Sequence, residues 1–472
     1  MSSASSSSYK SIDTINPSTG KVIATYNNAS DKEISGRVNG AKVAFESWQK
    51  KSISERSEYL RNLGKVLVKK KDEYSKLITE EMGKPIRQSK AEIEKCRWVC
   101  NYYADHTESF LADEIVPTEF HKSFVSFEPL GVIAAIMPWN FPFWQVMRFA
   151  VPAVAAGNAI ILKHSSKTIG CSIKIQEAFD DAGFPENVFT SVIGDRTVGE
   201  SLVRADIDAV SITGSVKAGK RVSELASKDL KRFVLELGGS DPFVVFEDAD
   251  MDRVAQMAVK SRFINTGQSC IAAKRFIVVK EIVNEFTKLF VENAENEVVG
   301  DPMNSKTTIG PLVSKGSRDA VAGQVDDAKT KGSDVLAGGK IVDREGYFYE
   351  PTILSNVNHD MDVLAEETFG PVAPVIVVDS PDEAIHEANN TEFGLGASIW
   401  TGDIEQGLNA ARHIKSGIVS INDMVKSDPR MPFGGIKNSG IGRELSHYGI
   451  KEFVNIKSIM VKDPSIPEIP VE

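Results

Sequence analysis

Between Leu130 and Leu237, short apolar runs rich in β-branched residues alternate with amphipathic segments of helical spacing. The predicted strands are residues 131–137, 159–162, 187–193, 209–213 and 233–237, and the predicted helices are residues 144–156, 169–182, 197–204 and 218–227. Parallel neighbouring strands need a crossover connection, and a helix is the usual one. The alternation therefore predicts an open parallel α/β sheet with helices on its faces, which binds ligands at the carboxyl ends of its strands.

A second series of the same kind begins at Asp241. Its predicted strands are residues 242–246, 276–279, 372–378, 398–401 and 418–421, and its predicted helices are residues 251–264, 283–296, 383–389 and 404–414. This series predicts a second α/β domain.

The two ends of the chain show other patterns. Residues 12–24 predict a strand–turn–strand piece, and helices are predicted at residues 31–48, at 54–82 with Ser54 as its start, and at 86–110. The run from Ser2 to Ser8 predicts a frayed terminus. The alternating segment 452–461 predicts an exposed strand without a local partner, and hence pairing with another subunit.

Composition excludes several classes of protein. The 472 residues carry 65 acidic and 55 basic side chains, a formal net charge of −10, which argues against nucleic acid or an anionic membrane as the main partner. The most apolar stretch, residues 130–156, is interrupted by Pro138, Pro142 and Arg148, and no secretory signal is visible. Four cysteines do not form a disulfide framework, so we expect a soluble cytoplasmic protein.

Polar side chains stand at or just beyond the ends of the predicted strands of the first sheet. Asn140, Lys163, Ser215 and Glu236 are the chief examples. Each has an ordinary structural explanation, because Asn beside Pro often forms a turn and a lysine at a strand end is usually a surface cation. Their recurrence at one edge of one sheet favours a function, because burying polar groups costs free energy at a place where the sheet would bind a ligand.

The glycines of the first sheet give a weaker signal. Gly214 to Gly219 opens a helix after a strand, where free N–H groups and the helix dipole can bind an anion. The segment lacks the Gly-x-Gly-x-x-Gly pattern, so taken alone it favours a plain helix start over an anion site.

The cysteines divide into two kinds. Cys96 and Cys100 lie one helical turn apart without a nearby histidine, and with Cys171 they are expected to be small buried apolar side chains. Cys270 stands in a small, polar segment near backbone N–H donors, where a thiol pKa is lowered and a nucleophile forms. The spacing predicts no metal site, and an inert loop cysteine is the alternative for Cys270.

Five motifs taken together resemble the aldehyde dehydrogenase superfamily. They are PWNFP at 138–142, ELGG at 236–239, GQSC at 267–270, EETFGP at 366–371 and PFGGIKNSG at 432–440. The motifs occur in the family's order and spacing. The segment 424–445 is similar to the corresponding segment of NADP-dependent succinate-semialdehyde dehydrogenases. Glyceraldehyde dehydrogenases share much of the same sequence pattern.

The resemblance implies a catalytic role for three residues. Cys270 would attack the aldehyde as a thiolate, and the Asn140 amide with the Cys270 N–H would hold the oxyanion. Glu236 would activate the water that hydrolyses the thioester, which favours release of a free acid. Two alternatives are a cysteine-dependent acyltransferase or hydrolase on the same fold, and a non-catalytic family member.

The resemblance also implies a nicotinamide cofactor. The family positions fall on Trp139, Lys163, Ser166, Gly214, Ser215, Leu237, Glu367 and Phe369. NAD-preferring relatives usually carry a glutamate at the position of Ser166, where it binds the ribose 2′-hydroxyl. A serine beside Lys163, His164 and Ser165 can instead hydrogen-bond a 2′-phosphate, so NADP is the predicted cofactor, with NAD as the alternative.

The substrate and the assembly follow from the same resemblance. Arg148 and Ser427 match two of three carboxylate-binding positions of succinate-semialdehyde enzymes, whereas Ile264 occupies the place of a second arginine. Short aldehydes such as glyceraldehyde therefore stay as alternative substrates. The implied fold is a Rossmann-like cofactor domain at 1–110 and 129–238, a catalytic α/β domain at 239–445, and oligomerisation strands at 111–128 and 446–472, forming a dimer or homotetramer.

Overall fold

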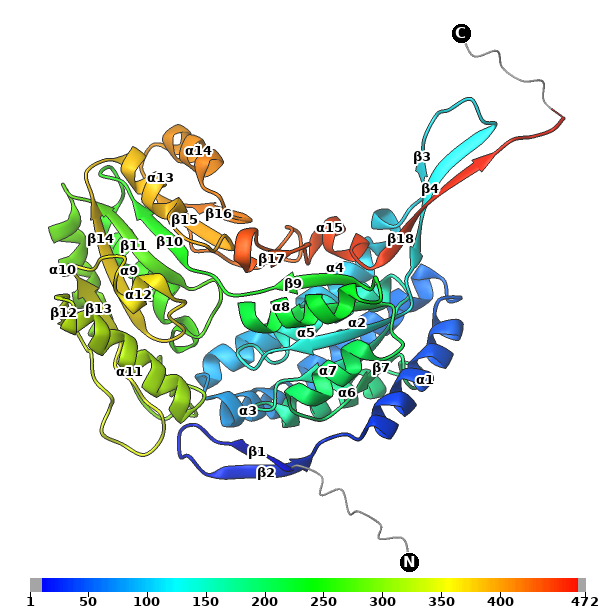
Figure 1. Ribbon diagram of the computed structural model, residues 1–472, viewed down its shortest axis with the longest axis horizontal. Coiled ribbons are helices and arrows are strands. Elements are labelled where there is room, and N and C mark those ends of the chain that lie inside the picture. The colour runs from blue at the N-terminus through cyan, green and yellow to red at the C-terminus, as the bar shows by residue number, and fades with distance from the viewer. Residues whose placement is uncertain (1–10, 466–472) are drawn as a thin grey trace, which may run out of the picture.

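The computed structural model describes residues 11–465, so the serine run at 2–8 lies outside the described part of the chain. The body consists of two sheets with helices on their faces, and a three-stranded arm projects from it (Figure 1). The prediction of an α/β fold with two open, largely parallel sheets is confirmed.

The first sheet has six strands in the order β17-β9-β8-β5-β6-β7. Their bounds are β5 Val132–Met137, β6 Ala159–His164, β7 Phe189–Ser191, β8 Ala209–Thr213, β9 Arg232–Glu236 and β17 Gly440–Ile441. All neighbours are parallel except β17, which pairs antiparallel with β9. β17 comes from the part of the chain that the sequence places in the second domain, so the two sheets are joined there.

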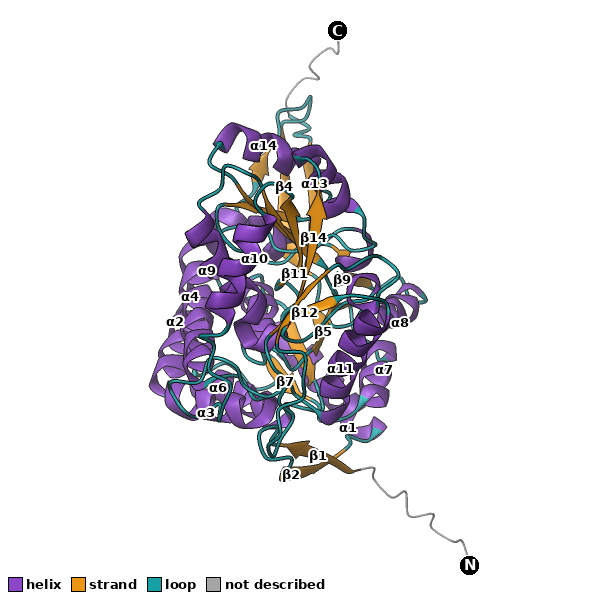
Figure 2. Ribbon diagram, turned by 90° about the vertical axis from the view of Figure 1, so that its left-hand side faces the viewer, coloured by secondary structure: helices purple, strands orange, loops and turns teal. Residues whose placement is uncertain are grey.

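Both faces of the first sheet are covered, as Figure 2 shows from the side. Alternate side chains of each strand point to opposite faces. Helices α1 (Asp31–Trp48), α7 (Arg196–Arg204) and α8 (Val216–Ser227) pack with Val132 and Ala134 on one face. On the other face lie α2 (Ile53–Lys69), α3 (Lys71–Met82), α4 (Ile86–Phe110), α5 (Trp144–Ala155) and α6 (Ile169–Asp181), which pack with Ile133 and Ala135.

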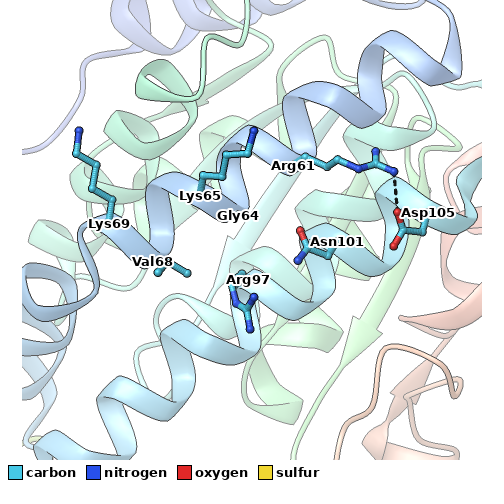
Figure 3. Close-up of a pocket in the computed structure, with 8 residues that line it drawn as sticks. All are labelled: Arg61, Gly64, Lys65, Val68, Lys69, Arg97, Asn101 and Asp105. Atoms are coloured by element: carbon cyan, nitrogen blue, oxygen red, sulfur yellow. Dashed lines mark hydrogen bonds and ion pairs between the residues drawn. The ribbon is translucent and has the colours of Figure 1, made fainter.

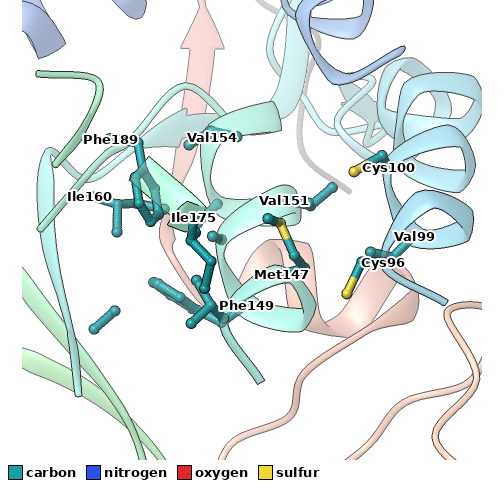
Figure 4. Packing of buried hydrophobic residues seen from close by; sticks show 14 of the residues in the cluster. Cys96, Val99, Cys100, Met147, Phe149, Val151, Val154, Ile160, Ile175 and Phe189 are labelled. Atoms are coloured by element: carbon teal, nitrogen blue, oxygen red, sulfur yellow. The ribbon is translucent and has the colours of Figure 1, made fainter. Parts of the chain in front are cut away.

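The second face holds the larger core. Met147 and Val151 of α5 lie beside Cys96 and Cys100 of α4 (Figure 4), and the prediction that Cys96, Cys100 and Cys171 are buried is confirmed. The predicted helix 54–82 is wrong in two details. Ser52, rather than Ser54, caps α2 in a capping box with Glu55, and the helix breaks at Lys70 between α2 and α3.

The second sheet has seven strands in the order β12-β13-β14-β11-β10-β15-β16. Their bounds are β10 Asp241–Val245, β11 Ala273–Val279, β12 Asp334–Ala337, β13 Thr352–Ser355, β14 Val372–Val378, β15 Gly396–Trp400 and β16 Ile418–Ile421. The helices of this part are α9 Met251–Phe263, η1 Ile264–Gly267, α10 Val283–Ala294, α11 Lys315–Thr330, α12 Asp362–Ala365, α13 Pro381–Asn389 and α14 Ile404–His413. Near the C-terminus follow η2 Lys437–Ser439 and α15 Ser446–Lys451, and the N-terminal hairpin is β1 Ser11–Ile15 with β2 Val22–Asn27.

The arm corrects one prediction about the C-terminal strand. β18 (Val454–Val461) has a partner in its own chain, because β4 (Lys122–Pro129) pairs with it antiparallel along its whole length, and β3 (Glu114–Ile115) lies on the other side of β4. The partner precedes β18 by more than 300 residues, so a local reading could not find it. β18 is still an edge strand on its far side within the described residues.

Candidate active site

The strand order of the first sheet explains why the predicted polar residues meet. The chain leaves β5 for β6 on one side, and later returns to β8 on the other side. The ends of β5, β6 and β8 thus form a crevice at which the strand order reverses, and ligands of open α/β sheets bind at such a point. Asn140, Lys163 and Ser215 follow or end these three strands.

The loop that carries Cys270 has an unusual backbone. Asn265, Thr266 and Gly267 all have positive φ angles, of 53°, 58° and 73°. A Cβ atom on Gly267 would overlap the Gly370 carbonyl. Three successive residues in a conformation that L-amino acids rarely adopt persist only when their surroundings fix them, and such strain gathers at functional sites.

Those surroundings are a network of buried polar contacts. The fully buried Arg262 donates to the carbonyls of Ala273, Thr368 and Gly370. The Gln268 side chain accepts from the Val313 N–H at 2.9 Å. The loop before Cys270 is therefore held from both sides.

We expect Gly267→Ala to lower the free energy of unfolding by about 2–4 kcal/mol, because the added methyl group meets backbone atoms and the φ angle is strained. Chemical denaturation measures this value. The control is Gly323→Ala in α11, where a Cβ atom meets nothing within 4 Å and the helix gains up to about 1 kcal/mol. If the two variants had equal free energies of unfolding, the conclusion that the surroundings fix the Gly267 loop would be contradicted.

Two N–H donors converge beside Cys270. The Asn140 amide Nδ2 donates to the Gln268 carbonyl at 3.1 Å, and the Asn140 carbonyl accepts from Asn265 Nδ2 at 2.8 Å. One hydrogen of the Asn140 amide remains for another acceptor. The Cys270 N–H has no acceptor among residues 11–465, whereas its carbonyl accepts from Lys274 Nζ at 2.7 Å. The pair of donors suits an oxyanion.

The electrostatics of the thiol correct the sequence prediction. Cys270 is half-buried, and burial raises its pKa to about 12, although the charges of Arg148 and Lys274 act to lower it. The prediction of a lowered thiol pKa is wrong for the chain alone. Desolvation exceeds the effect of both cations and of the neighbouring N–H groups.

Glu236 ends β9 with its carboxyl group buried. Neither oxygen has a hydrogen-bond partner in the described part of the chain, and a Cβ atom on Gly434 would lie 2.6 Å from Oε1. Burial, and then the charge of Glu444, raise the pKa of Glu236 well above its usual value. A buried carboxyl group without partners is costly, which points to a group kept for chemistry.

Glu367 joins the same cluster from the loop before β14. Its Oε1 accepts from the Gly239 N–H at 3.0 Å and lies 3.4 Å from Lys274 Nζ. The rings of Trp139 and Phe369 meet edge to face with centroids 5.7 Å apart. The structure thus brings together residues predicted from the ends of both sheets. Lys274, which the sequence did not single out, binds the Ser269 and Cys270 carbonyls and pairs with Glu367.

Lys163 and Ser166 lie at the end of β6 and in the turn after it. Burial lowers the pKa of the Lys163 ammonium to about 8, although the charge of Asp195 acts to raise it. Both ring nitrogens of the neighbouring His164 are hydrogen-bonded within the protein. Its Nδ1 accepts from the Ser165 N–H, so Nε2 carries the proton and donates to the Pro142 carbonyl at 2.9 Å. Burial lowers the pKa of His164 to about 4, so it is neutral.

The start of α8 completes the crevice with free donors. Ser215 caps the helix by accepting from the Ala218 N–H. The Val216 and Lys217 N–H groups have no acceptor in the described structure. Leu237 lies against Gly219, and a Cβ atom on Gly214 would meet nothing closer than 3.7 Å. The buried Lys163 ammonium, the space beside Gly214 and the free N–H groups at the start of α8 fit a phosphorylated nucleotide.

Comparison with known proteins agrees with this geometry. The sequence profile of the aldehyde dehydrogenase family matches residues 4–459. The chain belongs to the aldehyde dehydrogenase family. It is 46% identical over 451 residues to a probable succinate-semialdehyde dehydrogenase (NADP(+)) of Synechocystis, covering 95% of this chain and 99% of that protein. The crystal structure of a Streptococcus pyogenes succinic semialdehyde dehydrogenase with NADP+ superimposes with a TM-score of 0.93 at 33% identity, covering 96% of this chain and 100% of the other.

A second relative is the succinate semialdehyde dehydrogenase (NAD(P)+) Sad of Escherichia coli. It is 42% identical over 446 residues, which cover 94% of this chain and 96% of that protein. The family membership predicted from five motifs is therefore confirmed, and the protein is an oxidoreductase of the aldehyde dehydrogenase family.

Within this aldehyde dehydrogenase, Arg148 does not offer the free charge that was expected of it. Its buried guanidinium forms an ion pair with the buried Glu444 and lies 4.2 Å from the Phe433 ring centroid. The guanidinium is thus held in an ion pair within the protein and is not free to bind a substrate carboxylate. The sequence could not reveal this pair, since almost 300 residues separate its members.

Other features of the enzyme lie apart from this cluster. A surface cavity of about 620 Å³ between α2 and α4 is lined by Arg61, Lys65, Lys69 and Arg97 (Figure 3), and it contains none of the predicted site residues. Residues 11–465 contain no group of three or more His, Cys, Asp or Glu side chains that could hold a metal ion. No helix in that range is long and apolar enough to cross a membrane.

Proposed function

We propose that the protein oxidises an aldehyde to the carboxylic acid with NADP, and that succinate semialdehyde is its substrate. The observation that carries the proposal is the arrangement around Cys270. A half-buried thiol lies beside two N–H donors that can hold an oxyanion. The unpartnered carboxyl group of Glu236 ends a neighbouring strand.

The residues divide the reaction into two steps. Cys270 Sγ adds to the carbonyl carbon and releases its proton to solvent, and the Asn140 amide and Cys270 N–H stabilise the oxyanion of the thiohemiacetal. When bound, the nicotinamide ring would supply the acceptor for the hydride of the thiohemiacetal carbon, and Cys270 would then hold the acyl group as a thioester. Glu236 then takes a proton from water, and the attack of this water releases the acid and the thiol.

Cofactor preference rests on the turn after β6. Ser166 carries a hydroxyl where a carboxylate would repel a 2′-phosphate, and the buried Lys163 lies near the end of the strand just before this turn. The names of the Synechocystis and S. pyogenes relatives mention NADP(+) or NADP+. Lys163, Ser166, Gly214, Ser215 and Leu237 would hold the adenosine and phosphate portions. Trp139, Glu367 and Phe369 would contact the nicotinamide portion.

We expect Ser166→Glu to reverse the preference from NADP to NAD, because the new carboxylate repels a 2′-phosphate and accepts a 2′-hydroxyl hydrogen bond. The kcat/KM for NADP should fall by about 100-fold, the size of a lost charge-assisted contact plus repulsion. Steady-state kinetics with both cofactors measures the change. Ser166→Asn, which adds bulk without charge, should keep NADP preferred. A wild-type enzyme that uses NAD as well as NADP would overturn this assignment.

The substrate proposal is supported by the names of the relatives, which specify succinate semialdehyde. A panel of succinate semialdehyde, glyceraldehyde and propanal, followed by absorbance of the reduced cofactor, tests it. We expect succinate semialdehyde to have the highest kcat/KM. Glyceraldehyde is the alternative substrate, because Ile264 occupies the place of the second arginine. Equal kcat/KM values for all three aldehydes would refute a site for the substrate carboxylate.

We also propose the domain division and assembly stated from the sequence. The cofactor domain is 1–110 with 129–238, and the catalytic domain is 239–445. Residues 111–128 and 446–472 are the proposed oligomerisation part. The open edge of β18, with Ile456 and Met460 exposed, supports a homodimer or homotetramer. The four free cysteines support a reducing compartment such as the cytoplasm.

A further inference from the structure

A lysine on α4 lies beside the predicted substrate residue Ser427. The position of this lysine is fixed by Glu92, whose Oε1 accepts from the Phe143 and Trp144 N–H groups at 2.9 and 3.0 Å. These N–H groups open α5, directly after the segment that carries Asn140. The contact joins α4 to the start of α5, so the residue one turn beyond Glu92 on α4 faces α5 as well.

That residue is Lys95. Its Nζ lies 4.3 Å from the centroid of the Trp144 ring and donates to Ser427 Oγ at 2.6 Å. The indole Nε1 of Trp144 donates to the same oxygen at 3.1 Å. Trp144 and Ser427 are both buried, whereas Lys95 is only half-buried. The Lys95 ammonium group therefore contacts two buried side chains while part of Lys95 stays exposed.

Lys95 differs from the other cations near the site. Lys84 pairs with Glu92, Arg148 with Glu444, and Lys274 with Glu367. Lys95 has no carboxylate within 4.0 Å among residues 11–465; the carboxylate of Asp428 is bound by Arg430 at 2.6 Å. Burial and the charge of Arg148 lower the pKa of Lys95 to about 8, so the ammonium form predominates at neutral pH without a counter-ion of its own.

Ser427 supplies a second donor at the same place. Its oxygen already accepts two hydrogen bonds, from Lys95 and Trp144, and its own proton has no acceptor in the described residues. A hydroxyl whose two acceptor positions are filled can still donate. Lys95 and Ser427 thus present N–H and O–H donors. A substrate with a distal carboxylate can accept these hydrogen bonds, whereas an aldehyde with an apolar distal end cannot.

The cluster is connected to the reacting thiol through α5. Trp144 opens α5 just after the segment that carries Asn140. The Asn140 amide donates to the carbonyl of Gln268, two residues before Cys270, so the start of α5 lies between the Lys95 cluster and the thiol loop. A substrate with an aldehyde at one end and a carboxylate at the other would suit this arrangement.

We propose that Lys95, together with Ser427, binds the distal carboxylate of the semialdehyde substrate. This inference rests on the proposed function and deepens it. It assigns the cationic role to a residue of α4, which compensates for Ile264 and for the ion pairing of Arg148 with Glu444.

The test compares Lys95→Met and Lys95→Arg with the wild type on two four-carbon aldehydes, succinate semialdehyde and butanal, with NADP. We expect Lys95→Met to lower kcat/KM for succinate semialdehyde by about 10- to 100-fold, chiefly through KM, the range for a lost charged hydrogen bond. Butanal should change by less than about twofold, since it has no carboxylate to lose. Lys95→Arg should recover part of the loss. Lys90→Met, an exposed lysine on the same helix, serves as the control for charge removal.

Two results would overturn the assignment of Lys95. One is an equal loss with both aldehydes, which would show a structural role, and the other is no loss with the semialdehyde. Calorimetric titration with succinate gives a measure that does not depend on turnover. If the wild type oxidises no aldehyde, the proposed function fails, and the titration still decides about Lys95. If Lys95→Met binds succinate more weakly than the wild type, the result supports Lys95 as the carboxylate-binding residue. If the two proteins bind succinate equally, the assignment is overturned.

Discussion

Replacing Cys270 by alanine should lower kcat/KM for every aldehyde by at least about 10⁴-fold, as expected when a covalent nucleophile is removed. The thiol is the half-buried sulfur beside the Asn140 amide and the unpartnered Cys270 N–H. The other three cysteines are fully buried in the helical core. The measurement is the absorbance of reduced cofactor at saturating NADP and aldehyde.

Thiol labelling gives the control for this prediction. Iodoacetamide should modify one thiol in the native wild type and none in Cys270→Ala, because Cys96, Cys100 and Cys171 have no exposed surface. Since burial raises the pKa of Cys270 to about 12, labelling of the chain alone should be slow at pH 7 and accelerate with rising pH. Residual turnover above a few per cent in the alanine variant would show that another group is the nucleophile.

The parallel sheets were predictable because their signal is local. Strands such as β8 (Ala209–Thr213) and β16 (Ile418–Ile421) are short runs rich in apolar and β-branched residues, and their residue ranges match the predicted ones. The region from 297 to 371 gave no expected elements, although it contains α11, β12 and β13. In α11 only Val321, Val325 and Ala328 are buried, so its apolar stripe is too narrow to stand out from the charged residues around it.

The residues of the candidate site could be singled out from the sequence for a different reason. Asn140, Lys163 and Glu236 each lie where a strand of the first sheet ends, and topology alone brings such ends together. The electrostatics were not predictable, because they depend on contacts between distant parts of the chain. The ion pair of Arg148 with Glu444, the partner of β18 and the raised pKa of Cys270 all arise from tertiary packing.

Replacing Glu236 by glutamine should separate the two halves of the reaction. The first half requires Cys270 and the oxyanion donors, so one equivalent of reduced cofactor should still form rapidly per active site. Hydrolysis of the thioester requires a base for the attacking water, so steady turnover should fall by about 10²- to 10⁴-fold, the contribution of a general base. Stopped-flow absorbance records both the burst and the slow phase. Glu247 is exposed, so the matched control Glu247→Gln should leave both the burst and the slow phase unchanged.

The pH dependence and stability of the glutamine variant provide independent tests. A raised carboxyl pKa means that Glu236 stays protonated to a higher pH, so wild-type turnover should increase with pH, whereas that of Glu236→Gln should not follow the increase. Because the carboxyl group ionises more easily in the unfolded chain, it destabilises the fold once the pH exceeds its usual value. The glutamine variant should therefore unfold at pH 8 at a temperature no lower than the wild type. A variant that loses the burst while remaining folded would place Glu236 in the first half of the reaction, and one that keeps steady turnover would remove it from the mechanism.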